Sequence, residues 1–198
     1  MIHIFKKGTN DKTLLLLHGT GGDEYDLIDI ANFVDPNANI LSLRGNVQEH
    51  GMNRFFKRFA SGVYDFNSIR LETENLNNFI EEAVTKYNLN KDLITGIGYS
   101  NGANLLESLL QQKGNVLNSV ILFNPSLLNP DLKFKDLKGV KVFITTSKQD
   151  QYTTYDQQLF LHNKIKDNNG QLEVFWSNYG HQLTKESVIK AKSWYESK

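Results

Sequence analysis

Apolar runs of strand length alternate with amphipathic segments along most of this chain. The runs predict strands at residues 2–5, 13–17, 39–43, 93–99, 119–123, 140–146 and 171–176. Segments with helical periodicity are centred on residues 25–33, 68–87, 101–112, 154–168 and 185–194. This alternation favours an α/β fold with a mostly parallel sheet and helices on both faces. In such a fold, ligands bind at the carboxyl edge of the sheet, so side chains that follow the strands are the first candidates for chemistry.

One pentapeptide lies at that edge, between the strand at 93–99 and the helix that follows it. Gly98, Tyr99, Ser100, Asn101 and Gly102 form a G-x-S-x-G pattern, which is typical of a nucleophile elbow when it joins a strand to a helix. The flanking glycines suit a turn where two backbones come close together. The alternative interpretation is an ordinary tight Ser/Gly turn, so the pattern requires partner residues.

A serine nucleophile needs a base, and the base needs an orienting acid, in the chain order Ser, Asp or Glu, His. Only two histidines follow Ser100. His181 lies on a loop after the last strand and is the predicted base, whereas His162 falls within a helical pattern. Asp150 follows the strand at 140–146 and is the predicted acid, while Asp156 belongs to the first turn of the next helix.

Donors for a tetrahedral oxyanion are expected from backbone N–H groups. The strand at 13–17 runs into His18, Gly19, Thr20, Gly21 and Gly22, a glycine-rich turn in the position of the second oxyanion element of this type of fold. The N–H groups of Thr20 and Asn101 are the predicted pair. His18 precedes the nucleophile, and we therefore interpret it as a residue that holds this loop.

The segment 44–66 is irregular and rich in aromatic residues, with arginines among them. It is predicted to be a partly helical wall beside the nucleophile, with Phe55, Phe56 and Phe59 as contacts to the substrate. The alternative is that these rings pack the segment onto the sheet. Arg44 and Glu49 could form an ion pair or contact the substrate, and the sequence does not decide between the two.

These motifs together resemble small α/β-hydrolases of the phospholipase/carboxylesterase group, which includes acyl-protein thioesterases. Within that group the resemblance is greatest to bacterial carboxylesterases of the hydroquinone-stress type. It rests on segments 17–24, 44–51, 54–56, 98–104 and 180–181, which are spread over nearly the whole chain. One departure is Gln151, because such proteins usually carry proline after the triad acid. The resemblance implies a compact α/β-hydrolase fold, and the irregular segment 44–66 is too short for a separate cap domain.

Composition adds limits to this interpretation. The 198 residues are within the range of a single domain, 1–198, and the 22 basic and 22 acidic side chains leave no net charge to favour nucleic acid or an anionic membrane. The absence of cysteine excludes disulfides and thiolate metal sites. No signal peptide or membrane span is evident, so we expect a cytoplasmic protein without stable membrane association. A homodimer is left open.

The predicted function is hydrolysis of small, short-chain carboxylic esters through a serine–histidine–aspartate triad and an acyl-enzyme, without metal or cofactor. An acyl-protein or acyl-CoA thioesterase would use the same residues. A hydrolase homologue that binds a small ligand and turns it over slowly is the third possibility, because a fold does not fix a function.

Overall fold

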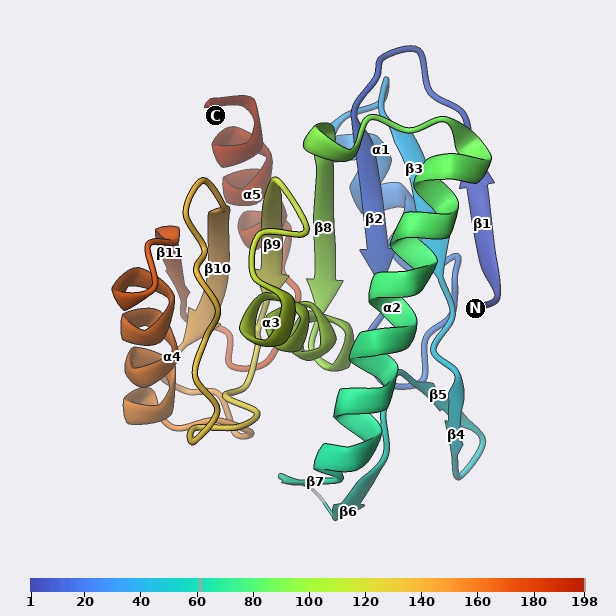
Figure 1. The fold of residues 1–198 in the computed structure, drawn as a ribbon. Coiled ribbons are helices and arrows are strands. Elements are labelled where there is room, and N and C mark those ends of the chain that lie inside the picture. Colours follow the sequence, from blue (N-terminus) through green and yellow to red (C-terminus); the bar gives the residue numbers. More distant parts are fainter. Residues whose placement is uncertain (61, 198) are drawn as a thin grey trace.

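The central element is a twisted sheet of seven strands, seen in a computed structural model that describes residues 1–60 and 62–197 (Figure 1). The strand order is β1-β3-β2-β8-β9-β10-β11. β1 pairs antiparallel with β3, and all the other neighbours in this sheet are parallel. The strands are β1 (His3–Lys6), β2 (Thr13–Leu17), β3 (Asn39–Leu43), β8 (Ile94–Tyr99), β9 (Ser119–Phe123), β10 (Lys141–Ser147) and β11 (Gln171–Ser177).

Helices cover both faces of this sheet, as the alternating pattern predicts. In Figure 1, α2 (Phe66–Tyr87), α3 (Asn101–Lys113) and α4 (Tyr155–Asp167) lie in front of the sheet. α1 (Ile28–Val34) and α5 (Lys185–Ser197) lie behind it and pack against each other. A short 3₁₀ helix, η1 (Lys91–Leu93), leads into β8. The α/β-hydrolase fold predicted from the sequence is therefore confirmed.

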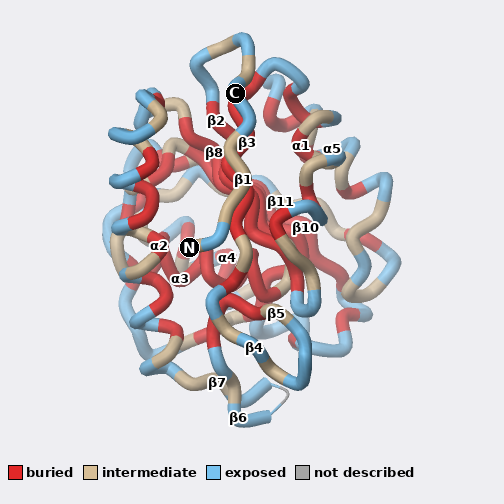
Figure 2. Tube along the Cα trace, turned by 90° about the vertical axis from the view of Figure 1, so that its right-hand side faces the viewer, coloured by how far each residue is buried: buried red, intermediate tan, exposed pale blue. Residues whose placement is uncertain are grey.

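Burial follows from this layering. All five residues of β2 and of β9 are buried, because a parallel strand in the middle of such a sheet is covered by helices on both faces. Figure 2 shows the buried part of the chain concentrated along the central strands, with exposed positions on the outer sides of the helices. This rigid centre carries the loops at the carboxyl ends of β2, β8, β10 and β11.

Two small hairpins lie at the carboxyl edge of the sheet, at the lower right of Figure 1. β4 (Val47–Glu49) pairs antiparallel with β5 (Met52–Arg54), and β6 (Arg58–Ala60) pairs antiparallel with β7 (Val63–Tyr64). The prediction of a partly helical segment here is wrong. His50 and Gly51 connect the first hairpin with positive φ angles of 50° and 79°, the backbone of a tight hairpin turn, and such turns favour strand pairing over a helix.

None of the helices in the described part of the chain is long and apolar enough to span a membrane.

Candidate active site

Ser100 lies on a sharp turn between β8 and α3. Its backbone adopts φ 50° and ψ −109°, outside the conformations that most side chains prefer, and its N–H donates to the Phe123 carbonyl at 2.9 Å. A Cβ atom at Gly98 would lie 2.6 Å from the Ala103 nitrogen, and one at Gly102 would lie 2.1 Å from the Leu17 carbonyl oxygen. The two glycines are therefore required by the close approach of strand and helix, as expected for a nucleophile elbow.

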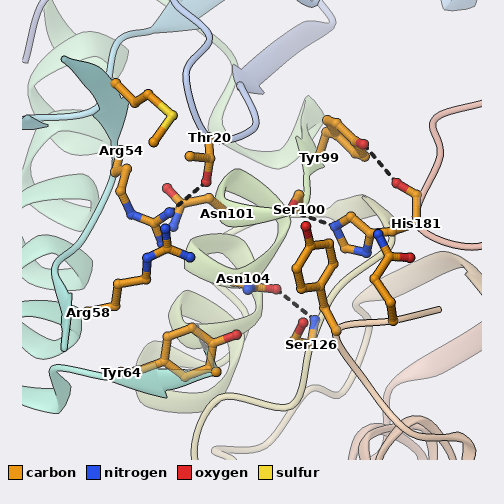
Figure 3. Close-up of a pocket in the computed structure, with 14 residues that line it drawn as sticks. Thr20, Arg54, Arg58, Tyr64, Tyr99, Ser100, Asn101, Asn104, Ser126 and His181 are labelled. Carbon is orange, nitrogen blue, oxygen red and sulfur yellow. Dashed lines mark hydrogen bonds between the residues drawn. The ribbon is translucent and has the colours of Figure 1, made fainter. Parts of the chain in front are cut away.

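The structure brings Ser100, His181 and Asp150 into one hydrogen-bonded chain. Figure 3 shows the contact between Ser100 and His181. His181 Nε2 lies 2.8 Å from Ser100 Oγ, and His181 Nδ1 lies 2.7 Å from Asp150 Oδ2. With the imidazole proton on Nδ1, that nitrogen donates to the carboxylate and Nε2 accepts from the serine hydroxyl. A nucleophile, a general base and an orienting acid would have this geometry.

Contacts to the backbone hold the His181 loop in place. The Tyr99 hydroxyl donates to the His181 carbonyl at 2.9 Å, and Asn124 Nδ2 donates to the Gly180 carbonyl at 3.0 Å. The imidazole also meets the ring of Tyr152 edge-on, with centroids 4.7 Å apart. Each contact comes from a different element, so the position of the imidazole does not depend on its own loop alone.

The predicted acid, Asp150, is almost enclosed. The Asp150 side chain has no exposed surface, and its Oδ1 accepts from the Tyr152 backbone N–H at 2.8 Å while Oδ2 faces the imidazole. The Asp150 N–H donates to the Ser147 carbonyl, which closes the turn after β10. Gln151 occupies the position where related proteins usually carry proline. The turn forms without that proline because these two hydrogen bonds fix the loop.

Both competing residues lie elsewhere. Asp156 is in the first turn of α4, as predicted. His162 is on the same helix, where it is buried, with 5% of its surface exposed and its ring against Trp176. Burial lowers the pKa of His162 to about 4. Neither residue lines the cavity next to Ser100.

The predicted oxyanion donors flank the serine. Asn101 is the first residue of α3, so its N–H has no acceptor within the helix. The Thr20 N–H donates no hydrogen bond to another residue in the described ranges. The Thr20 hydroxyl accepts from Arg54 Nη1 at 2.8 Å, and Asn101 Oδ1 accepts from the Phe55 N–H at 2.7 Å. These bonds tie both segments to the end of β5 and to the residue that follows it.

His18 holds the glycine-rich loop, as predicted. Its Nδ1 lies 2.6 Å from the Gly19 carbonyl, and its Nε2 accepts from the Gly45 N–H at 3.0 Å. An imidazole that accepts through Nε2 must be neutral, and burial lowers the pKa of His18 in agreement with this state. His18 thus connects the loop after β2 to the segment after β3.

A cavity of about 530 Å³ opens beside Ser100 and is lined mostly by polar side chains. Its walls combine the glycine-rich loop after β2, the two hairpins, the start of α3 and the loops after β10 and β11. The lining residues are Thr20, Met52, Arg54, Arg58, Gly62, Tyr64, Tyr99, Ser100, Asn101, Asn104, Ser126, Gln151, Tyr152 and His181. The volume is that of a site for a small molecule.

The prediction of an aromatic wall is wrong for all three phenylalanines. Phe55 and Phe56 have no exposed surface and belong to the hydrophobic core, where Phe55 packs against His18 and Phe56 against Tyr64. Phe59 is 76% exposed, and it is not among the residues that line the cavity. The packing alternative therefore holds for Phe55 and Phe56, which follow β5 and turn their rings into the core.

The side chains that segment 44–66 does turn toward the cavity are those of Met52, Arg54, Arg58 and Tyr64. Sequence reasoning noted the arginines without giving them a role. The sequence feature that could have identified them is the presence of positive charges within an apolar segment. A guanidinium that becomes buried there, as that of Arg54 does, requires a polar partner or a ligand.

The ion pair left open between Arg44 and Glu49 does not form. Arg44 instead makes a two-pronged pair with Glu24, at 2.5 and 2.8 Å, and this pair lowers the pKa of the Glu24 carboxyl. Glu49 faces Arg58 at 3.0 Å and Arg54 at 3.6 Å. Glu24 thus holds the start of segment 44–66 through Arg44, and Glu49 holds its middle through Arg54 and Arg58.

In the part of the chain that the structure describes, no three His, Asp or Glu side chains gather in a way that could hold a metal ion.

Known proteins resemble this chain over nearly its full length, although no family model matches it. It is 41% identical over 196 residues to the putative hydrolase MhqD of Bacillus subtilis (strain 168), a match that covers 99% of this chain and 98% of that protein. A carboxylesterase from Bacillus cereus has 41% identity and a TM-score of 0.96, with 98% of this chain and 93% of that chain covered.

A third relative is YahD, described in a structure with malic acid, which has 34% identity and a TM-score of 0.93 over 99% of this chain and 98% of its own. The motifs, the fold and these relatives agree. The chain therefore belongs to the α/β-hydrolases of the phospholipase/carboxylesterase type and is a hydrolase.

Proposed function

We propose that this hydrolase cleaves small, short-chain carboxylic esters by a two-step route through an acyl-enzyme on Ser100. The observation that carries the proposal is the continuous hydrogen-bond chain from Ser100 Oγ through the His181 ring to Asp150. Ser100 and His181 line a cavity of about 530 Å³ together with Thr20 and Asn101, the predicted oxyanion donors. The carboxylesterase from Bacillus cereus supports the reaction class through its similarity.

The chemistry follows from the positions of the atoms. His181 Nε2 takes the proton from Ser100 Oγ as that oxygen attacks the ester carbonyl carbon. The carbonyl oxygen gains negative charge, which the N–H groups of Thr20 and Asn101 stabilise. His181 then gives its proton to the leaving alcohol oxygen as the carbon–oxygen bond breaks, and Ser100 is left acylated.

Water completes the cycle. His181 Nε2 takes a proton from a water molecule, whose oxygen attacks the acyl carbon, and the imidazole returns the proton to Ser100 Oγ as the acid leaves. Throughout, Asp150 holds Nδ1–H and stabilises the imidazolium that forms. The nearly closed environment of its carboxylate strengthens that interaction.

The preference for small substrates rests on the cavity. Its volume of about 530 Å³ suits a small ester, and no cap domain extends over the sheet edge in the described ranges. A thioester could react with the same atoms, so a thioesterase is the second candidate. Esters and thioesters that share one acyl group and differ in chain length separate the two by their kcat/KM values.

Replacement of the nucleophile tests the proposal directly. Ser100→Ala should lower the turnover of phenyl butanoate by several orders of magnitude, because removal of a triad nucleophile abolishes the covalent route. The fold should be retained, which circular dichroism checks. Turnover within about tenfold of the parent in a folded variant contradicts the role of Ser100.

Steady-state turnover also separates an esterase from a binding protein with a slow triad. A parent enzyme that releases one equivalent of phenol and then stops would favour the binding protein. Sustained release of many equivalents supports the esterase.

A further inference from the structure

Two guanidinium groups lie side by side in the wall of the cavity. Arg54 comes from the end of β5 and Arg58 from the start of β6, and both line the cavity next to Ser100. Arg54 is 3% exposed, whereas the Arg58 side chain is 27% exposed. Figure 3 shows both side chains on the opposite side of Ser100 from His181. An ester hydrolase needs neither group for the triad chemistry itself.

The charges in this wall are not balanced. Glu49 is the one carboxylate that pairs with the two arginines in the described part of the chain, at 3.0 Å from Arg58 Nε and 3.6 Å from Arg54 Nε. No acidic side chain is among the residues that line the cavity. Burial, together with the neighbouring Arg58 charge, lowers the pKa of Arg54, which indicates that its charge is poorly compensated.

Both arginines also have N–H donors that bond to no residue in the described ranges. Arg54 uses Nε toward the Phe56 carbonyl and Nη1 toward Thr20, but its Nη2 bonds to no residue in the described ranges. Arg58 donates to Glu49 through Nε alone. Its two terminal nitrogens make no hydrogen bond to the described residues. A carboxylate fits such donors, because its two oxygens match the fork of a guanidinium.

The position of the arginines indicates which part of the ester would carry that carboxylate. The leaving oxygen must lie near His181 Nε2, from which it receives its proton, and the carbonyl oxygen must face Thr20 and Asn101. The acyl chain is the part of the ester that these two constraints do not place. It extends from the carbonyl carbon away from the imidazole. That is the side on which Arg54 and Arg58 lie (Figure 3).

We propose that the substrates are monoesters of dicarboxylic acids, whose free carboxylate is bound by Arg58 and Arg54 at the far end of the acyl chain. This inference rests on the proposed esterase function and specifies its substrate class. The overall reaction consumes one water and releases an alcohol, a dicarboxylate and a proton. Both arginines then act as specificity-determining residues, and Arg54 also holds Thr20 through its hydroxyl.

Matched esters test the inference with the intact protein. The monophenyl esters of succinic, glutaric and adipic acid are compared with the same compounds capped as methyl esters, and phenol release is corrected for the spontaneous reaction. For at least one chain length, kcat/KM should be about tenfold or more higher for the anionic ester, the worth of a hydrogen bond between charged groups. Added salt should reduce this ratio, because it screens the attraction.

Arg58→Gln is the test variant, since Arg58 does not touch Thr20. We expect it to bring the ratio of anionic to capped ester close to one, while Arg58→Lys keeps part of the preference. Lys57→Gln is the matched control, because Lys57 is exposed, carries the same charge one position away and is absent from the cavity lining. It should leave the ratio unchanged.

A second measurement needs no variant. The free dicarboxylate should inhibit hydrolysis of the neutral phenyl butanoate competitively, at least tenfold better than the monocarboxylate of the same length. Ratios near one in the parent for all three chain lengths, or an unchanged ratio in folded Arg58→Gln, overturn the inference. Hydrolysis of phenyl butanoate that depends on Ser100 would still stand in that case, so the proposed function fails only if this neutral ester is not turned over either.

Discussion

At the scale of single residues, the roles proposed for His181 and Asp150 predict graded losses of activity. His181→Ala should reduce kcat about as much as loss of Ser100, because without the imidazole the hydroxyl has no base within reach. Asp150→Asn should be severe but milder, since the geometry is retained while the tautomer of the imidazole is no longer imposed. Steady-state kinetics on phenyl butanoate measure both effects.

His162→Ala is the matched control for a lost imidazole. His162 lies on α4, away from the cavity, so its loss should lower stability and leave kcat of the folded enzyme nearly unchanged. An essential His162 together with a dispensable His181 would require a different base, in conflict with the distance of 2.8 Å to Ser100.

Site residues whose order along the chain is set by the fold could be predicted from the sequence. Ser100, Asp150 and His181 each follow a strand, and parallel strands bring their carboxyl ends to one edge, which is where the structure places them. The inward or outward direction of Phe55, Phe56 and Arg54 could not be predicted in this way. It depends on how the first hairpin and the two residues after it lie on the sheet, a long-range contact with no local signal.

At the scale of elements, the elbow depends on the fit between β2 and α3. A methyl group at Gly102 would meet the backbone oxygens of Leu17 and His18 at 2.1 and 2.6 Å, and backbone atoms cannot swing aside. Gly102→Ala should therefore cost about 1 to 3 kcal/mol in the free energy of unfolding, as overpacking does. It should also lower kcat by tenfold or more, because the displaced strand leads directly into the Thr20 loop.

Gly139→Ala provides the comparison for that variant. Gly139 has a φ of 88° and no atom within 4 Å of an added Cβ, so the cost is that of the backbone alone, about 1 to 2 kcal/mol. Its activity per folded molecule should equal that of the parent. Equal kcat values for the two variants, measured at the same folded fraction, would argue against the elbow as the sensitive element.

The two phenylalanines Phe56 and Phe59, after the first hairpin, predict a separation between stability and specificity. Phe56→Leu removes buried ring atoms and should cost about 1 to 2 kcal/mol, with kcat/KM for all esters reduced by a common factor or not at all. Phe59→Leu, at an exposed position, should change stability by no more than about 0.5 kcal/mol. Thermal unfolding and a chain-length series test both, and a changed ester ratio in Phe56→Leu would return this ring to the substrate wall.

Strands in the sheet could be predicted closely, and the hairpins could not. β2, β3 and β9 have the predicted bounds, since a strand buried on both faces is a continuous apolar run. β4 to β7 contain only two or three residues each, too few to reveal an alternating pattern. α1 begins at Ile28, later than the expected residue 25, because turns occupy the residues before it.

At the scale of the whole molecule, two buried groups with displaced pKa values couple stability to pH in opposite directions. Burial raises the pKa of Glu107, which has no exposed surface, to about 8, although the Leu128 backbone lowers it slightly. Burial lowers the pKa of His162 to about 4. The folded state therefore favours the uncharged form of both residues.

The sign of each effect follows from proton binding. Between the reference value of 4.5 and about 8, folded Glu107 keeps a proton that the unfolded chain has lost, so stability falls by at most about 1.4 kcal/mol per pH unit as the pH rises. Between about 4 and 6.5, the unfolded chain binds a proton at His162 that the folded chain lacks, so stability rises with pH by a similar slope.

Together these slopes predict the pH range in which each group changes the free energy of unfolding. They nearly cancel between pH 4.5 and 6.5, and the Glu107 effect remains alone between pH 6.5 and 8. Glu107→Gln has no proton to lose, so its free energy of unfolding relative to the parent should rise steadily from pH 6.5 to 8. Urea unfolding of parent and variant at matched pH values measures this difference, which cancels the contribution of all the other groups. A difference that stays constant over this range would mean that Glu107 is already ionised in the folded protein.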